Sequence, residues 1–510
     1  TLMRITKTLF CEFAAAPKIA RFHVNDKEIY KQIQELEYGG MDGAKIGQSV
    51  EDQVMELFDK NDIQAPQGDF FGAINDSSRL FAENAKIIYQ PWFQSYNLLV
   101  RSDFLVRNEE GTYDLWEVKA KNTVRKPTKG EPLKEELIND ISFQRYVISK
   151  VLGEKFSGKC FLVYLNKDYI RQWELDTHQL IKKEDVTAEL LDNQNIENTI
   201  SLMSTQLGLE RRAFESMYPY DNEDHFSYFG LPAPKESIRA IPGIGPKKKV
   251  LYELGKTNIL TLGEEEKSLL LSSKGEATKA SDYVEMYQKS ETLMDTERIK
   301  TQLSVLEYPL FFYDYETISS PVPLFDGTTS RQHIVVQYSV HKIDLDGTIT
   351  HKECLISDKI TDNKQVISQL YEDLEHGNGT YIVWYKGFEN SRNMETANMY
   401  PEYREFFEKV NEHTFDLMEV FSEYSYFDRR FKGSASIKKV LPVMTDISYD
   451  GLDVSNGVIA TTILMDIATG NVPAEQLEKH RQNLLEYCKQ DTWAMVRIWQ
   501  ELVKKIETPQ

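Results

Sequence analysis

The chain has 510 residues, of which 41% are hydrophobic and 27% are charged, and its formal net charge is −20. This length predicts two or three domains, and the composition excludes an intrinsically disordered protein. No apolar run approaches the roughly 20 residues that span a bilayer, so we expect no membrane partner. The acidic balance argues against nonspecific coating of nucleic acid, although basic residues can still gather locally.

The four cysteines are scattered along the chain and form no C-x-x-C pair. We therefore expect neither disulfides nor structural zinc, and a reducing compartment fits this pattern. The first residues also lack a charged-then-apolar signal pattern. Together these features predict a cytoplasmic protein.

Residues 1–210 are predicted to form an α/β domain, because apolar positions alternate between helical and strand periods. An Asn-Glu-Glu-Gly turn at 108–111 separates two apolar runs and indicates a hairpin. The expected elements are a helix at 43–58, strands at 87–89 and 98–100, the hairpin of 103–106 and 113–119, a helix at 133–152 and a strand at 160–164.

The hairpin carries Asp103, Glu117 and Lys119. Residues two apart on a strand share a face, so Glu117 and Lys119 project together and the hairpin brings Asp103 beside them. Two carboxylates can hold one Mg²⁺, which acidifies a water and stabilises charge on a phosphate. An E-x-K pair alone is more often an ordinary surface hairpin. The upstream Asp, the glycine turn and the following helix favour a catalytic site.

Residues 43–165 resemble the RecB-like group of PD-(D/E)XK nucleases, which combine an early acidic helix, an Asp, an E-x-K strand and a helix bearing Gln and Tyr. The resemblance implies Glu51 as a further metal ligand and Gln144 as a site residue. The chain departs from the usual Gln-x-x-x-Tyr at Ile148. Many relatives hold an iron–sulfur cluster through flanking cysteines. The matching stretches, 14–18 and 218–229, contain none, so we predict no iron–sulfur cluster.

Basic residues follow the E-x-K strand and also mark the middle of the chain. Lys121, Arg125 and Lys126 form a run that either contacts DNA phosphates or is a solvated charged loop. Residues 211–304 are predicted as a helical connector, whose segment 240–249 resembles a helix–hairpin–helix turn. The residues predicted to contact a nucleic-acid backbone there are Gly243, Gly245, Lys247 and Lys248. The alternative is a Gly-Pro turn with solvated lysines.

Residues 305–510 are predicted to form a second domain with a mixed sheet. Its expected elements are strands at 310–315, 334–340, 351–356 and 381–385, and a closing helix at 474–506. Asp314 and Glu316 share one face of the first strand, and Tyr487 and Asp491 share one face of the helix. Brought together, they offer three carboxylates and a phenol to two Mg²⁺ or Mn²⁺ ions. With an ordinary pKa near 10, Tyr487 suits positioning a water better than removing its proton.

This second half is similar to the RNase-H-like DEDD 3′→5′ exonucleases of the Y-x-x-x-D subgroup. A D-x-E pair or a Y-x-x-x-D pair alone is common on protein surfaces. Their occurrence in this order within one domain favours the resemblance. The family's middle Asp is replaced here by Glu389, with Asp416 as a second candidate for this ligand. Lys438 and Lys439 are either contacts to a nucleic-acid backbone or surface lysines of a helix.

The whole chain thus resembles an uncharacterised family of bacterial two-nuclease proteins. The resemblance implies an α/β fold with a restriction-endonuclease-like domain, a helical connector and an RNase-H-like (DnaQ-type) domain. We expect a Mg²⁺- or Mn²⁺-dependent nuclease that hydrolyses DNA in repair, recombination or defence, with a 3′–5′ exonuclease site in the C-terminal half. The alternatives are an RNA-processing exonuclease, a nucleic-acid-binding protein with one decayed site, and a structural subunit of a helicase complex. No Walker G-x-x-x-x-G-K-[ST] motif occurs, so any helicase is a separate partner.

Overall fold

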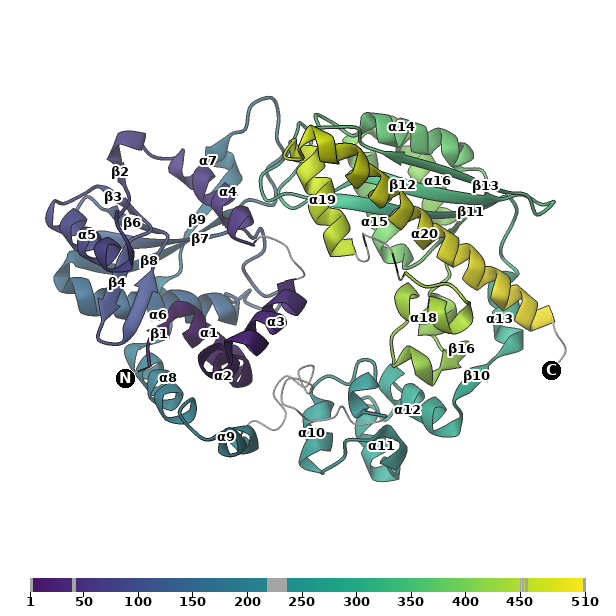
Figure 1. The fold of residues 1–510 in the computed structure, drawn as a ribbon, viewed down its shortest axis with the longest axis horizontal. Coiled ribbons are helices and arrows are strands. Elements are labelled where there is room, and N and C mark those ends of the chain that lie inside the picture. Colours follow the sequence, from purple (N-terminus) through teal and green to yellow (C-terminus); the bar gives the residue numbers. More distant parts are fainter. Residues whose placement is uncertain are drawn as a thin grey trace. The chain divides into compact units, whose positions relative to one another are not determined.

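The computed structural model describes residues 3–38, 43–217, 236–449, 451, 454 and 457–507. Contacts between residues divide the chain into two compact units, both of mixed α/β structure (Figure 1). The first unit comprises Thr1–His225 and Ser320–Gln332, and the second comprises Phe226–Ser319 and His333–Gln510. No helix among the described residues combines the length and the apolar character needed to cross a membrane.

The first unit is built on a six-stranded mixed sheet with the order β2-β3-β6-β7-β8-β9. Its strands are β2 (Ile63–Gln64), β3 (Ile87–Tyr89), β6 (Phe104–Arg107), β7 (Tyr113–Lys119), β8 (Phe156–Leu165) and β9 (Ile181–Asp185). The predicted hairpin is confirmed, because β6 and β7 pair antiparallel and Phe104 lies opposite Trp116. A smaller sheet joins β1 (Ile5–Thr6), β5 (Leu98–Arg101) and β4 (Trp92–Ser95).

Helices cover both faces of the six-stranded sheet. They are α1 (Lys7–Ala15), α2 (Pro17–Asn25), α3 (Lys27–Tyr38), α4 (Gly43–Met55), α5 (Phe70–Ala82), α6 (Glu135–Leu152), α7 (Thr177–Leu180), α8 (Asn193–Gln206) and α9 (Arg211–Met217). Phe143 of α6 stacks on Phe10 of α1 with ring centroids 4.7 Å apart, within the larger apolar core. Val50 and Val54 of α4 belong to a second core with Phe104 and Val118. The predicted helices at 43–58 and 133–152 are thus confirmed as α4 and α6.

The second unit contains a five-stranded mixed sheet with the order β13-β12-β11-β14-β15. Its strands are β11 (Leu310–Ser319), β12 (His333–Ile343), β13 (Ile349–Leu355), β14 (Thr380–Val383) and β15 (Thr414–Asp416). The first three strands pair antiparallel, whereas β14 and β15 run parallel to β11. The four strands predicted in this half are therefore confirmed to within a few residues.

Successive side chains of β11 point to opposite faces of this sheet. Leu310 and Phe312 pack into a core with the C-terminal helix α20 (Ala474–Glu507), whereas Tyr315 hydrogen-bonds Asn393 of α15 on the other face. The helices of the unit are α14 (Lys364–Asp373), α15 (Lys386–Met399), α16 (Arg404–Glu412), α17 (Glu419–Ser422), α18 (Ile437–Met444), α19 (Gly457–Thr469) and α20. Figure 1 shows α20 running along the sheet, so Asp314 and Glu316 share the face of β11 that α20 covers.

Of the described part of the predicted connector, α9 belongs to the first unit and residues 236–304 fold with the second unit. These residues form α10 (Lys247–Glu253), α11 (Glu264–Leu270), α12 (Lys279–Lys289), α13 (Thr296–Leu303) and β10 (Thr292–Met294), which pairs antiparallel with β16 (Tyr426–Asp428). Phe427 of β16 lies in one apolar cluster with Ile238 and Tyr283. Gly433 has a φ of +75°, and a Cβ there would come within 1.7 Å of the Ala240 carbonyl oxygen. This close approach requires glycine.

Candidate functional site

The first carboxylate cluster forms where β7 faces α6. Glu117 is 1% exposed, and Lys119 donates from Nζ to Glu117 Oε1 at 2.7 Å and to Asp140 Oδ2 at 2.6 Å. Gln144 of α6 donates from Nε2 to Glu117 Oε2 and to Asp140 Oδ1, both at 2.8 Å. The structure thus brings together the predicted Glu117, Lys119 and Gln144, and it adds Asp140.

Asp103 and Glu51 are the other members of the predicted set, and Glu51 lies on α4, which packs against Val118 on the face of β7 opposite to that of Glu117. Asp103 precedes β6, and its Oδ2 accepts the backbone N–H of Val118 at 2.7 Å. Burial, followed by the charge of Glu117, raises the pKa of Asp103 well above its ordinary value, and the charge of Glu51 adds to this effect. Glu51 on α4 is held by Tyr89, whose hydroxyl donates to Glu51 Oε2 at 2.7 Å.

Lys7 of α1 is a member of this cluster that the sequence analysis missed. Its Nζ lies 3.0 Å from Glu117 Oε1 and 3.4 Å from Asp140 Oδ1. Burial opposes the charged form of Asp140, but Lys119 and Lys7 outweigh burial and hold the pKa of Asp140 below its usual range. Asp140 lies four residues before Gln144 and so on the same helical face, which was a usable signal. Lys7 is 110 residues from Glu117, and no local pattern links them.

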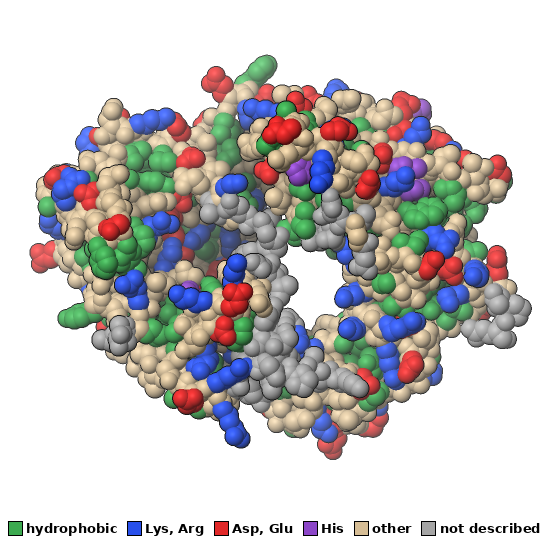
Figure 2. Space-filling view, in the orientation of Figure 1, with side chains coloured by type: hydrophobic (Ala, Val, Ile, Leu, Met, Phe, Trp, Pro, Cys, Tyr) green, Lys and Arg blue, Asp and Glu red, His purple; other side chains and the backbone are tan. Residues whose placement is uncertain are grey.

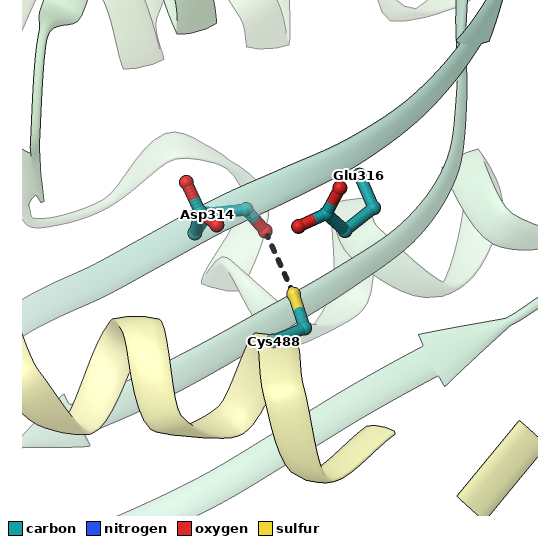
Figure 3. Close-up of side chains that lie close together, drawn as sticks. All are labelled: Asp314, Glu316 and Cys488. Atoms are coloured by element: carbon teal, nitrogen blue, oxygen red, sulfur yellow. Dashed lines mark hydrogen bonds between the residues drawn. The ribbon is translucent and has the colours of Figure 1, made fainter. Parts of the chain in front are cut away.

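The second cluster joins β11 to α20 in the second unit. Gln337 of β12 donates from Nε2 to the Leu484 carbonyl at 2.8 Å, which holds α20 against the sheet. Figure 3 shows Asp314 and Glu316 on β11 with Cys488 of α20 beside them. Among the described residues, these three form the one group whose potential metal-ligand atoms all lie within 4.8 Å of one another.

The acids of the second cluster interact electrostatically. Burial, together with the charges of Asp491, Glu389 and Glu316, raises the pKa of Asp314 well above its ordinary value. Burial and Asp491 raise the pKa of Glu316 to about 8, although Lys438 opposes the shift. Burial also raises the pKa of Asp491 to about 6. Crowded carboxylates of this kind retain protons near neutral pH unless a cation compensates them.

Glu389 lies in the first turn of α15, where sequence reasoning placed the middle acid. Glu389 is 3% exposed, and burial raises the pKa of its carboxyl group to about 8. This carboxyl group also interacts with that of Asp314. No group in the described part of the chain hydrogen-bonds Glu389 Oε2, which is buried. A buried carboxylate oxygen without a partner points to a ligand at this position.

Asp416, the second candidate for the middle ligand, is engaged by backbone N–H groups, and its role as a metal ligand stays a prediction. Its Oδ1 accepts the backbone N–H of Tyr385 at 3.0 Å and that of Met418 at 3.1 Å, and its Oδ2 accepts that of Lys386 at 2.9 Å. Tyr385 precedes α15 with a φ of +83°, a left-handed conformation that needs support in a non-glycine residue. Asp416 therefore fixes the start of α15 and, through it, the place of Glu389.

Two tyrosines and a lysine surround Asp491. The Tyr449 hydroxyl donates to Asp491 Oδ1 at 2.5 Å, a contact that the sequence did not indicate. Lys438 of α18 lies over the rings of Tyr449 and Tyr487, with Nζ 5.3 Å and 5.4 Å from their centroids. Burial, followed by the charge of Asp491, raises the pKa of Tyr487 far above 10. Tyr487 therefore stays a phenol that can orient a water molecule.

The basic run after the E-x-K strand is engaged in ion pairs. Arg125 pairs with Glu184 and Glu189, Lys121 lies 3.4 Å from Glu136 Oε1, and Lys126 lies 4.0 Å from Glu135 Oε2. Figure 2 shows lysine and arginine side chains interspersed with acidic ones over the visible face. These contacts fit the alternative of a solvated charged loop more closely than a phosphate-binding track.

The glycine turn of the connector has the backbone form that its sequence predicts. Gly243 and Gly245 have φ values of +67° and +52°. Lys247 donates from Nζ to the Leu270 and Leu271 carbonyls at 3.1 and 2.7 Å, so its ammonium is held within the protein. Its assignment as a phosphate contact stays a prediction, and Lys248 follows it in α10. Lys439 lies on α18 beside Lys438. Of the two cysteine-free stretches, 218–229 lies outside the described residues.

Comparison with known proteins gives matches to uncharacterised sequences. Residues 311–436, which include Asp314, Glu316 and Glu389, match the model of a family described as Domain of unknown function (DUF2779). The Uncharacterized protein MG366 of Mycoplasma genitalium is 26% identical over 250 residues, covering 44% of this chain and 37% of that protein. Its homolog in Mycoplasma pneumoniae is 29% identical over 223 residues, covering 39% of this chain and 33% of that protein.

A third relative, the Uncharacterized protein UU173 of Ureaplasma parvum, is 27% identical over 220 residues, covering 38% of this chain and 31% of that protein. The chain thus matches about a third of the length of each of these relatives. Among solved structures, the crystal structure of SSO0001 is similar at 17% identity with a TM-score of 0.25, covering 46% of this chain and 87% of that one. A score this low carries no argument about fold or function.

Proposed function

We propose that the chain is a divalent-metal-dependent nuclease whose second unit is a DEDD-type 3′–5′ exonuclease of RNase-H-like fold. The observation that carries the proposal is the convergence of Asp314, Glu316, Glu389 and Asp491 from a strand and two helices. Burial raises the pKa of all four carboxyl groups, and the charges of neighbouring acids add to the shift at Asp314 and Glu316, so their charged forms are unfavourable as they stand. Such an arrangement is costly unless it serves to bind a cation.

The donor set fits Mg²⁺ or Mn²⁺. Both ions prefer carboxylate oxygens, and the four acids offer these, including the unpartnered Oε2 of Glu389. Cys488 is a poor ligand for such hard ions, because burial and the charge of Asp314 raise its pKa well above the ordinary value and keep it a thiol. Bound there, the ions would acidify a water and stabilise charge on the attacked phosphate.

Two tyrosines and a lysine beside the acids have separate proposed roles. The Tyr487 phenol would orient the attacking water, and the burial that raises its pKa favours this role over that of a base. Tyr449 holds the Asp491 carboxylate in place through its short hydrogen bond. Lys438 is a positive charge at the edge of the cluster and can attract a backbone phosphate.

For the first unit, we propose a second nuclease site of the RecB-like PD-(D/E)XK type. Glu51, Asp103 and Glu117 would hold the metal ion, Lys119 would neutralise developing charge, and Gln144 keeps Glu117 in its orientation. The proposed substrate is DNA, in repair, recombination or defence, and a helicase or repair partner would supply any motor activity. Hydrolysis of RNA by the second unit is the alternative.

The proposal is tested with 5′-labelled single-stranded DNA and RNA of one sequence in the presence of Mg²⁺. We expect shortening from the 3′ end, and D314N should slow it at least about a hundredfold, because a lost metal ligand costs several kcal/mol. D344N, in the turn between β12 and β13, is the matched control and should leave the rate unchanged. Shortening by D314N at the wild-type rate would refute the exonuclease site. Faster shortening of the RNA would favour the RNA-processing alternative.

A further inference from the structure

Lys7 is held firmly at its position in the first unit. It is the first residue of α1, directly after β1, whose Ile5 pairs with Leu98 of β5. The Thr6 hydroxyl oxygen caps the helix by accepting the Leu9 N–H at 3.2 Å. The stacking of Phe10 on Phe143 then fixes α1 against α6. The fixed backbone thus places the Lys7 side chain at the carboxylate cluster. A lysine in an unstructured segment would sample many positions.

The Lys7 ammonium shares one oxygen with the lysine of the E-x-K strand. Lys7 Nζ and Lys119 Nζ lie 3.0 Å and 2.7 Å from the same Glu117 Oε1. The other Glu117 oxygen accepts from Gln144. Three donors therefore engage this carboxylate, which has about four acceptor sites. The Lys7 side chain is 25% exposed, so part of it reaches solvent beside the cluster.

From this geometry we infer that Lys7 is a resident counter-ion that competes with the divalent cation for Glu117. The inference rests on the proposed function of the first unit and refines it. A metal ion reaching Glu117 repels the Lys7 ammonium and has to displace it from Oε1. Lys7 therefore raises the metal concentration that the first site requires. It is a positioning residue, since it acts through Glu117.

The test measures Mn²⁺ binding by electron paramagnetic resonance on the full chain without nucleic acid. A D314N/D491N background removes metal binding at the second unit. In this background, K7M should bind Mn²⁺ about fivefold more tightly, the factor that corresponds to a partly exposed ion pair. K7R retains a positive charge and should restore the weaker binding. K60M removes a surface lysine paired with Glu56 in the same unit and should bind Mn²⁺ like the parent protein.

Further variants separate competition from a structural role. With E117Q added, K7M should no longer change Mn²⁺ affinity, because the shared oxygen has lost its charge. If K7M does not fold, K7Q replaces it, and the Mn²⁺-induced rise in melting temperature should be larger than for the parent. Unchanged or weaker Mn²⁺ binding in folded K7M or K7Q would overturn the inference alone. Absence of Mn²⁺ binding in every variant would overturn both the inference and the metal site proposed for the first unit.

Discussion

The first unit surrounds its buried carboxylates with lysines, whereas the second unit packs its carboxylates against one another. Lys119 and Lys7 hold the pKa of Asp140 below its usual range, although burial acts in the opposite direction. In the second unit, Lys438 opposes the shift of Glu316, yet the pKa of that group still rises to about 8. Both arrangements offset the cost of burying charge, the first through permanent side chains and the second only once a cation binds.

This difference gives the two clusters opposite responses to the loss of a charge. An ion-paired cluster loses stability when one partner is removed, because the other charge is left buried and unpaired. A cluster of like charges gains stability when one of them is neutralised. The predictions below use this contrast, and each is measured in EDTA unless a metal is named.

The largest effect is expected for K119M in the first unit. Loss of this ammonium leaves Glu117 and Asp140 with Lys7 as the remaining contacting cation among the described residues, and we expect the unfolding free energy to fall by about 3 kcal/mol. Chemical denaturation measures the change. The control K60M removes an exposed ion pair and should cost less than about 0.5 kcal/mol. A K119M protein as stable as the parent would show that the lysines do not stabilise this cluster.

The next effect is a pH dependence that differs between Asp140 of the first unit and the acids of the second unit, whereas the raised pKa of Asp103 gives that group the same sign as the second unit. Glu316 and Asp491 have pKa values raised to about 8 and about 6, so their contribution to stability is present below the ordinary carboxyl pKa and is lost as pH rises through these values. Asp140 has a lowered pKa, so its contribution is present above the ordinary value of about 3.9 and is lost as pH falls. The second unit should therefore lose about 2 kcal/mol between pH 5 and pH 8.

The two units can be followed separately because each holds three of the six tryptophans, at 92, 116 and 173 in the first and at 384, 493 and 499 in the second. Denaturation of protein labelled with 5-fluorotryptophan, read by ¹⁹F NMR, reports both. Mg²⁺ should remove the loss at pH 8 in the second unit. A second unit that loses no stability between pH 5 and pH 8, or a first unit that loses none as pH falls below the ordinary carboxyl pKa, would contradict the contrast between the clusters.

A smaller effect of reversed direction is expected for D314N. Replacing this carboxylate with an amide of the same shape removes repulsion, so the second unit should gain about 1 kcal/mol in unfolding free energy. The ¹⁹F signals of the second unit measure this change, and D344N is again the control. The gain should disappear in Mg²⁺, because the cation stabilises the parent more than the variant. A loss of stability comparable with that of K119M would refute the account of the second cluster.

Local patterns predicted much of the fold and most residues of both candidate sites. The period of two placed Glu117 with Lys119 and Asp314 with Glu316, and the helical period placed Tyr487 with Asp491. These pairs lie on long, strongly apolar elements, where the period is easiest to read. Glu389 was found through its place after a buried strand. The same reasoning named Asp416, but the backbone groups that occupy its oxygens depend on the left-handed Tyr385, which has no sequence signature.

Contacts that depend on long-range packing were not predictable in this way. Lys7 reaches Glu117 only because α1 is fixed against α6, and the association of the connector with the second unit depends on Phe427 and Gly433. Burial and partners of this kind follow from the tertiary arrangement, which one sequence does not display. Tyr449 belongs to the same class, since it follows α18 in a segment without periodic pattern and still touches Asp491.

Tyr449 provides the finest test of the contrast, because its substitution changes a single hydrogen bond to one acid. Its hydroxyl stabilises the charged form of Asp491, so Y449F should raise the pKa of Asp491 further and weaken metal binding there. A group that orients a metal ligand typically contributes about tenfold to affinity, so the half-saturating Mg²⁺ concentration for 3′ trimming should rise about tenfold. Y96F, at an exposed tyrosine of the first unit, is the matched control. A weaker metal site is still filled at a high enough Mg²⁺ concentration, so Y449F should regain most of its trimming rate at saturating Mg²⁺. A rate that stays low at every Mg²⁺ concentration would instead mean that Tyr449 contacts the reacting phosphate.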